Sequence, residues 1–190
     1  MNIGFAFCGS FCTYRQVFPI LEELSVGHTV IPIFSKASAE TDSRFGQADA
    51  FLQQAERICG MKPLTELSQV EPIGPKKLLD ILVIAPCTGN TLAKLAHSIA
   101  DGSVTMAAKS HLRNGRPVVL AVSTNDALAG AAENIGKLLS RKNYYFVPFR
   151  QDSWEKKPTS LVADFTQIPK AVEAAQKGIQ IQPLLLSGNP

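Results

Sequence analysis

The segment 81–101 limits the possible folds of this chain more than any other part of the sequence. Its first four residues, 81–84, are all apolar, which is typical of a strand that is buried on both faces. We expect Pro86 to end this strand, because proline has no amide hydrogen to donate to a neighbouring strand. Apolar side chains then recur at helical spacing, at Leu92, Leu95, Ala96 and Ile99. The polar residues 87–91 therefore form a turn between the carboxyl end of a strand and the amino end of a helix.

This turn has the chemistry of an anion-binding site. Unpaired backbone amides and the positive end of a helix meet there, and both favour a phosphate or a carboxylate. Thr88, Asn90 and Thr91 add short side chains that can donate hydrogen bonds or cap the helix. Taken alone, the segment fits a ligand site and a simple helix cap equally well. The ligand site is favoured because similar polar turns follow other strands of the chain.

Strand-like and helix-like segments alternate along the sequence. Strands are expected at 2–8, 29–34, 81–84, 117–122 and 144–147, and helices at 14–25, 47–59, 92–99, 104–112, 127–139 and 167–177. Pro32 favours an edge position for the second strand, and Asp126 is the expected N-cap of the helix at 127–139. The alternation predicts a three-layer, doubly wound α/β fold of Rossmann-like or flavodoxin-like type, with a mostly parallel sheet and right-handed crossovers. We expect a single domain, 1–190, with a core at about 1–148 and a C-terminal flap, helix and tail at 149–190.

Three segments lack a clear pattern. Residues 60–77 contain several prolines and read as a loop with at most one short strand, and a loop of this length is functional or belongs to an interface. Residues 149–165 are irregular and carry the single tryptophan, Trp154, so we expect a surface flap or an intersubunit contact. The tail 178–190 is apolar at 184–186, where it could pack on a partner.

Composition argues against several classes of function. The net charge of +3 on 190 residues is too small to favour nucleic-acid binding. No apolar run approaches the roughly 20 residues that a bilayer span needs, and no signal peptide is evident, so we expect a soluble cytoplasmic protein without membrane contact. The four cysteines form no Cys-x-x-Cys pair and have no histidine cluster nearby, so we expect free thiols and no metal site.

Four polar turns follow predicted strands: Gly9 with Ser10, Ser35 with Lys36, 88–91, and 123–125. Ligands bind to open α/β sheets at the carboxyl ends of the strands, where the strand order reverses, so we expect these turns to share one rim. A phosphorylated cofactor held by hydroxyls and amides fits such a rim. Neither a Gly-x-Gly-x-x-Gly sequence nor a P-loop sequence occurs, which argues against a dinucleotide or a nucleoside triphosphate on this chain.

At these turns the chain resembles the flavoprotein family of homo-oligomeric, FMN-binding proteins, which includes cysteine decarboxylases and prenyl-FMN-forming prenyltransferases. The resemblance covers roughly residues 1–148, and its most specific part is 85–101. It implies FMN as the cofactor and a trimer-based homo-oligomer. It implies flavin contacts at Gly9, Ser10, Ser35, Pro86, Thr88, Asn90, Thr91 and Ser123. Ser123 departs from the family pattern, because the prenyltransferase branch has an arginine on the phosphate at this position.

Within the family, segments 9–13 and 123–128 are similar to a branch that acts with a separate NAD(P)-binding A subunit. That branch aromatises a small dihydro-dicarboxylate during sporulation, so the resemblance implies an oxidoreductase subunit whose hydride acceptor lies on its partner. The alternatives are a stand-alone FMN-dependent decarboxylase or flavin prenyltransferase, and a scaffold subunit that has lost the cofactor. The decarboxylase loses support because no histidine lies between His28 and His97 to act as acid or base.

No catalytic residue is assigned from the sequence. His97 falls inside a helical pattern and His111 near a helix end, so each is expected to be a core or cap residue rather than a catalytic one. Cys87 precedes a helix, where a thiol can have a low pKa and be reactive. A small, buried and inert cysteine is the favoured interpretation at this position.

Overall fold

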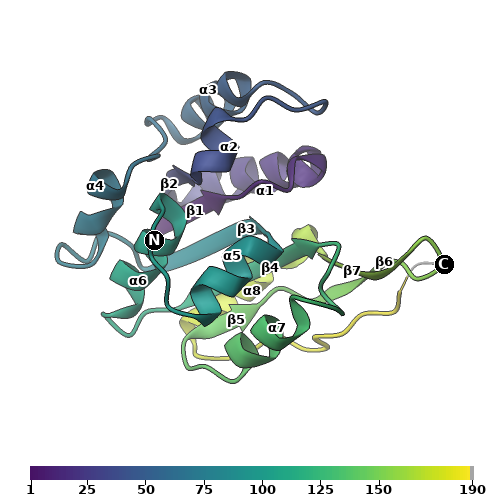
Figure 1. Ribbon diagram of the computed structural model, residues 1–190. Helices are drawn as coiled ribbons and strands as arrows, with labels where there is room; N and C mark the ends of the chain where they lie inside the picture. Colours follow the sequence, from purple (N-terminus) through teal and green to yellow (C-terminus); the bar gives the residue numbers. More distant parts are fainter. Residues whose placement is uncertain (189–190) are drawn as a thin grey trace.

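A sheet of mostly parallel strands organises the protein (Figure 1), and the computed structural model describes residues 1–188. The strands are β1 (Asn2–Phe7), β2 (Thr29–Phe34), β3 (Ile81–Cys87), β4 (Val118–Thr124), β5 (Tyr144–Phe146), β6 (Phe149–Ser153) and β7 (Lys157–Ala163). The helices are α1 (Tyr14–Gly27), α2 (Lys36–Glu40), α3 (Ala48–Cys59), α4 (Leu67–Val70), α5 (Gly89–Ala96), α6 (Ser103–Leu112), α7 (Ala132–Leu139) and α8 (Ile168–Gln176). Three short 3-10 helices, at Phe11–Thr13, Glu71–Ile73 and Phe165–Gln167, complete the elements.

The strand order confirms a doubly wound sheet. The strands lie in the order β2-β1-β3-β4, all parallel, and β4 then pairs along the same edge with β5 and, farther on, with β7. Helices α1 and α8 cover one face, and α5, α6 and α7 cover the other (Figure 1). This is the predicted three-layer flavodoxin-like architecture. The chain reverses its direction across the sheet between β1 and β3, so their carboxyl ends mark the place where a ligand is expected.

The core explains why these strands form. All seven residues of β3 are buried, as are the last five of β1, because helices cover both faces of the sheet. An aromatic cluster fills the space between β1, β2 and α1, where the ring of Phe7 lies 4.6 Å from that of Phe34 and 5.1 Å from that of Phe18. Pro32 lies in β2, which is an edge strand as predicted, so its missing amide hydrogen leaves no partner unsatisfied.

The prediction that Pro86 ends the third strand is wrong. Strand β3 continues to Cys87 through a cis peptide bond between Ala85 and Pro86. The pairing with β4 is regular up to Ile84 and resumes at Cys87 after a register shift. An irregularity of this kind accommodates a proline inside a sheet, because the residue without an amide hydrogen lies where the ladder is interrupted.

The polar turn at 123–125 is also placed incorrectly by the sequence. Ser123 and Thr124 belong to β4, where they pair with Val162 and Leu161 of β7. Asp126 does not cap α7, because the next residues form turns around its own backbone carbonyl and the helix begins only at Ala132. Short turns and helices of this kind depend on contacts with β7 that the local sequence does not contain.

Three further expectations on secondary structure need correction. Helix α5 ends at Ala96, so Ile99 lies beyond it with 47% of its surface exposed. Ser35 is the N-cap of the short helix α2 rather than part of an open turn. The segment 60–77 contains α4 and a 3-10 helix instead of a strand, and Leu64 makes only an isolated bridge to Ile33.

The largest departure lies in the segment 149–165, for which the sequence predicts an irregular structure. It forms the antiparallel hairpin β6–β7, which extends from the sheet (Figure 1). The tail runs beside β6, where the amide of Phe149 donates to the carbonyl of Leu184 and the amide of Leu186 donates to the carbonyl of Phe149, both at 3.0 Å. Asn189 and Pro190, at the end of the tail that could pack on a partner, lie outside the described residues. Within residues 1–188, no helix combines the length and the apolar composition that crossing a membrane requires.

Candidate functional site

The carboxyl ends of β1 and β3 bring two of the predicted turns together. Gly9 follows β1 and Thr88 follows β3, and both residues line two pockets that meet between them. This is the point at which the strand order reverses. The rim that the sequence predicts is therefore present, but it is divided into two hollows with different chemistry.

The first hollow, which we call the helix-end pocket, has a volume of about 720 Å³. Helices α2, α5 and α6 all begin at it, with Ser35, Thr88 and Gly102 as their N-caps. Its lining includes Cys8, Gly9, Ser35, Lys36, Glu40, Thr88, Asn90, Thr91, Lys94, Asp101, Gly102 and Ser103. The amino ends of α5 and α6 give this pocket a positive local potential, which favours an anion.

Side chains in the helix-end pocket act both as caps and as lining. The hydroxyl of Ser35 accepts from the amide of Ser38 at 3.2 Å, and the hydroxyl of Thr88 accepts from the amide of Thr91 at 3.4 Å. Ser103 anchors the start of α6 by donating to the carbonyl of Phe34 at 2.5 Å. The two interpretations of the turn at 87–91, a cap and a ligand site, are thus compatible with each other. Lys94 also reaches this pocket, paired with Asp101 at 2.9 Å.

The second hollow, which we call the hairpin pocket, is larger, at about 990 Å³. The first turn, the end of β4 and the hairpin β6–β7 form its walls, with Ser10, Cys12, Gln16, Thr88, Ser123, Asn125, Arg150, Asp152, Lys157 and Asp164 among its lining residues. The hydroxyl oxygens of Ser10 and Ser123 lie 2.8 Å apart, which ties the first turn to β4. Ser123 therefore makes a contact within the rim at the position where the prenyltransferase branch has an arginine.

All but one of the predicted flavin-contact residues lie at these two pockets. Ser35, Asn90 and Thr91 line the helix-end pocket, Ser10 and Ser123 line the hairpin pocket, and Gly9 and Thr88 line both. Pro86 is buried within β3 and lines neither pocket. The sequence predicts a turn at Pro86 because a proline usually ends a strand, but here β3 continues to Cys87.

Sequence reasoning also misses several charged residues of the site. Lys36 belongs to a predicted turn without being assigned a contact, and Lys94 lies on α5 four residues after Asn90, so the proximity of both to the site could have been inferred from the same turns. Arg150 and Lys157 have no such signal, because they come from the hairpin, where no regular structure is predicted. Only the pairing of β7 with β4 brings the hairpin to the rim.

The buried thiols near the rim are not activated. Burial raises the pKa of Cys8 to about 11, although its sulfur accepts a hydrogen bond from the Thr91 hydroxyl at 3.2 Å. Burial also raises the pKa of Cys87 well above its ordinary value, and the neighbouring Cys8 adds to this. Both thiols therefore stay protonated and are poor nucleophiles. The interpretation of Cys87 as a buried, inert cysteine is favoured over a reactive one.

The histidines do not reach the rim. His111 is buried in α6, its Nε2 lies 3.0 Å from the carbonyl oxygen of Pro117, and burial lowers its pKa to about 4. His97 is exposed and caps the carboxyl end of α5. Neither residue lines the helix-end pocket or the hairpin pocket, which agrees with the structural roles expected for both.

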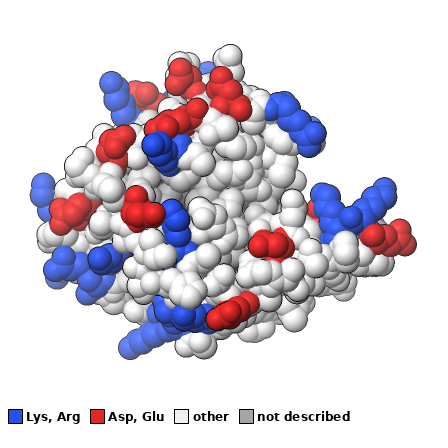
Figure 2. Space-filling view, in the orientation of Figure 1, with Lys and Arg blue, Asp and Glu red and all other residues white. Residues whose placement is uncertain are grey.

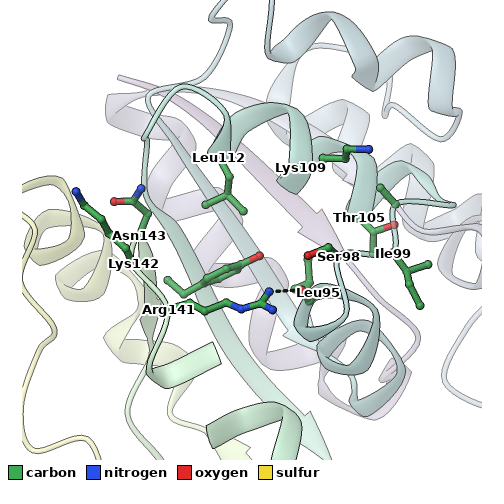
Figure 3. Close-up of a pocket in the computed structure, with 11 residues that line it drawn as sticks. Leu95, Ser98, Ile99, Thr105, Lys109, Leu112, Arg141, Lys142 and Asn143 are labelled. Atoms are coloured by element: carbon green, nitrogen blue, oxygen red, sulfur yellow. Dashed lines mark hydrogen bonds between the residues drawn. The ribbon is translucent and has the colours of Figure 1, made fainter. Parts of the chain in front are cut away.

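A third hollow lies away from the predicted residues. This basal pocket, of about 530 Å³, is formed by the end of α5, by α6 and by the segment before β5 (Figure 3). Leu95, Ile99 and Leu112 give it apolar walls, while Lys109, Arg141 and Lys142 surround it with cations. Arg141 binds the carboxyl end of α5, where it donates to the carbonyls of Leu95 and Ala96 at 3.1 and 2.7 Å.

Comparison with known proteins gives consistent matches. A profile of the flavoprotein family matches residues 1–173. The chain is 44% identical over 186 residues to the B subunit of dipicolinate synthase of Bacillus subtilis (strain 168), covering 97% of this chain and 93% of the relative. The crystal structure of the corresponding B subunit from Bacillus halodurans C has a TM-score of 0.90 at 42% identity, covering 99% of this chain and 97% of that one. The FMN-dependent cysteine decarboxylase SpaF shares the fold, with a TM-score of 0.68 at 22% identity and coverage of 92% and 97%.

Proposed function

Because this chain belongs to the flavoprotein family, we propose that it acts as the B subunit of a dipicolinate synthase, holds FMN, and works with a separate A subunit. The proposal is supported by similarity to the B subunits of two dipicolinate synthases along nearly the whole chain, in sequence and in structure. In this proposal the two subunits convert dihydrodipicolinate to dipicolinate during sporulation. The partner carries NAD(P), since this chain has no dinucleotide-binding sequence.

The convergence of helix starts at the helix-end pocket is the observation that carries the cofactor assignment. The first turns of α5 and α6 present backbone amides there, and Ser35, Thr88 and Thr91 add hydroxyls. Lys36 supplies a cation beside them. These donors fit a phosphate group, and the adjoining hairpin pocket adds enough volume for a ring system. The residues present thus fit a phosphorylated flavin without the arginine of the prenyltransferase branch.

The proposed reaction assigns different roles to the two subunits. Aromatisation of the dihydropyridine ring removes a hydride and a proton, and in this proposal the hydride would pass to NAD(P)⁺ on the partner. FMN, when bound, supplies a redox-active ring. The residues of this chain bind and orient: Gly9 allows close approach of the backbone between the two pockets, and the Ser10–Ser123 hydrogen bond holds the two strand ends together.

A stand-alone decarboxylase is not favoured as an alternative. The decarboxylase branch uses a histidine as its acid or base, and among residues 1–188 no histidine lines either pocket. The two buried cysteines nearby keep their protons, as described above. We also propose a trimer-based homo-oligomer, as the family resemblance implies, with the exposed apolar residues Ile99 and Leu139 available for intersubunit contacts.

The cofactor assignment is tested by the visible spectrum of the purified chain and a titration with FMN. We expect tight binding by the native chain and a loss of about 30-fold or more in Asn90→Asp, because a carboxylate in the first turn of α5 repels the phosphate at close range. Asp is favourable near a helix amino end, so the variant should fold well. Asn134→Asp, in the first turn of α7 and outside both pockets, is the matched control and should bind FMN nearly as the native chain does. Equal binding by all three proteins would contradict the assignment.

The reaction assignment needs the partner. The chain would be co-expressed with the A subunit, and dipicolinate formation from dihydrodipicolinate and NAD(P)⁺ would be measured by absorbance. We expect activity only when both subunits are present. Equal activity of the A subunit alone would contradict the proposal, and turnover by this chain alone would revive a stand-alone enzyme.

A further inference from the structure

The hairpin pocket contains two cations that the proposed cofactor site does not use. Arg150 on β6 and Lys157 on β7 both line it, and each is paired with an acid, Asp164 and Asp152 respectively. Figure 2 shows positive and negative side chains gathered over the outer part of this hairpin. The helix-end pocket, by contrast, receives its positive potential mainly from helix ends. The two pockets are thus equipped for two different anionic groups.

The orientation of the Arg150 side chain is fixed by its ion pair with Asp164. Its Nη2 donates to Asp164 at 3.3 Å, and both side chains are largely shielded, with 30% and 24% of their surfaces exposed. Asp164 in turn accepts from the Thr166 amide at 3.3 Å, from the Thr166 hydroxyl at 2.5 Å and from the Gln167 side chain at 3.1 Å. Partial burial opposes the charged form of Asp164, but these hydrogen bonds prevail and lower its pKa. Asp164 is therefore charged, both of its oxygens accept hydrogen bonds, and it holds the Arg150 guanidinium in a fixed orientation.

A guanidinium carries five N–H donors, and Asp164 takes one of them. An arginine oriented by one carboxylate presents its other donors in a rigid fork, which matches a second carboxylate in bidentate geometry. Because Arg150 lines the hairpin pocket, a ligand in that pocket can reach these donors. Lys157 is less rigidly oriented than Arg150. Its ammonium is a point charge on a flexible side chain, and about half of that side chain is exposed.

We propose that the hairpin pocket binds the pyridine dicarboxylate, with Arg150 holding one carboxylate and Lys157 the other. This inference rests on the proposed function and adds the place and the residues of substrate recognition. Arg150 lies in the regular part of the β6–β7 pairing, and Lys157 lies beyond its register shift, opposite Ser153; both residues line the same pocket. Two long side chains at one pocket can each hold one carboxylate of a small ring that bears two. Ser10 and Ser123 also line this pocket, and Ser123 and Arg150 both pair with Val162 of β7.

The test is calorimetric titration of the purified chain with dipicolinate and with picolinate, which has a single carboxylate. We expect the native chain to prefer dipicolinate by at least 10-fold. Arg150→Gln should weaken dipicolinate binding by 10- to 100-fold and remove the preference, and Lys157→Gln should have a smaller effect. Arg150→Lys keeps the charge without the fork and should give an intermediate affinity. Arg57→Gln, on the exposed side of α3, is the matched control and should bind as the native chain does.

Two further readouts separate this inference from its alternatives. FMN titration of Arg150→Gln should match that of the native chain, and in the complex with the A subunit this variant should raise KM more than it lowers kcat. Native-like dipicolinate binding by Arg150→Gln would overturn the inference while leaving the proposed function intact. So would a parallel loss of FMN, or displacement of dipicolinate by an equal concentration of inorganic phosphate. A complex of native subunits that forms no dipicolinate would instead overturn the proposed function.

Discussion

The parallel strands and the β6–β7 hairpin form opposite sides of one binding region and are built on different principles. Strands β1, β3 and β4 are buried along nearly their whole length and offer a ligand only their ends, where amides and small hydroxyls emerge. The hairpin is largely half-buried or exposed and offers charged side chains. The first arrangement is rigid because the core fixes it, which suits a cofactor. The second can vary its side chains at little cost in stability, which suits the choice of a substrate.

Removing one aromatic ring from each region should give the largest difference between them. Phe7→Ala deletes a fully buried ring in contact with Phe18 and Phe34, and we expect a loss of about 4 kcal/mol in the free energy of unfolding. Trp154→Ala removes a hairpin side chain that is 42% exposed, and we expect less than about 1 kcal/mol. Urea unfolding followed by circular dichroism measures both. Equal losses would mean that the hairpin belongs to the same cooperative core.

A change of pH should test the buried side of this comparison, because His111 lies in α6, which packs against the parallel strands. His111 has a pKa of about 4 in the folded chain and 6.5 ordinarily. Above pH 6.5 His111 is neutral in both the folded and the unfolded chain. Below pH 6.5 it is protonated in the unfolded chain but stays neutral in the folded chain until the pH approaches 4. Stability therefore falls as the pH drops from about 6.5 towards 4, and His111 accounts for about 2 kcal/mol of this between pH 7 and pH 4.5.

The His111 contribution is obtained by comparing variants. Urea unfolding at pH 7 and pH 4.5 should show a smaller pH effect in His111→Gln than in the native chain. His97→Gln, which changes an exposed histidine, should keep the native pH effect. An unchanged pH effect in His111→Gln would show that other groups dominate the acid sensitivity of the buried region.

The smallest expected difference concerns hydroxyls that support turns. Ser35→Ala removes the cap of α2 at the helix-end pocket and should cost about 1 kcal/mol. Ser153→Ala removes an exposed hydrogen bond to the Lys156 amide in the hairpin, at 3.4 Å, and should cost less than about 0.5 kcal/mol. Thermal unfolding of the two variants side by side measures this difference. A larger loss in Ser153→Ala would indicate that the hairpin turn is more rigid than its exposure suggests.

Prediction from sequence succeeded where local signals and burial agree. The spacing of apolar residues was enough to predict the buried strand at 81–84 and the amphipathic helices that follow strands. Pro32 correctly indicated an edge strand. The same reasoning located most of the site, since residues such as Gly9 and Thr88 lie at the carboxyl ends of strands in any doubly wound sheet. It failed at Pro86, because a register shift lets a proline remain inside a strand.

The sequence by itself determined the fold class, the order in which strands and helices follow one another, and the turns that reach the rim. These features depend on neighbouring residues and on which side chains avoid water. Only the tertiary structure decided that β7 pairs with the end of β4, that the rim is divided into two pockets, and that Arg150 and Lys157 line one of them. The physical reason is that a short, charged hairpin has little apolar periodicity of its own. Its position is set by pairing with a strand that is distant in the sequence, which no local pattern records.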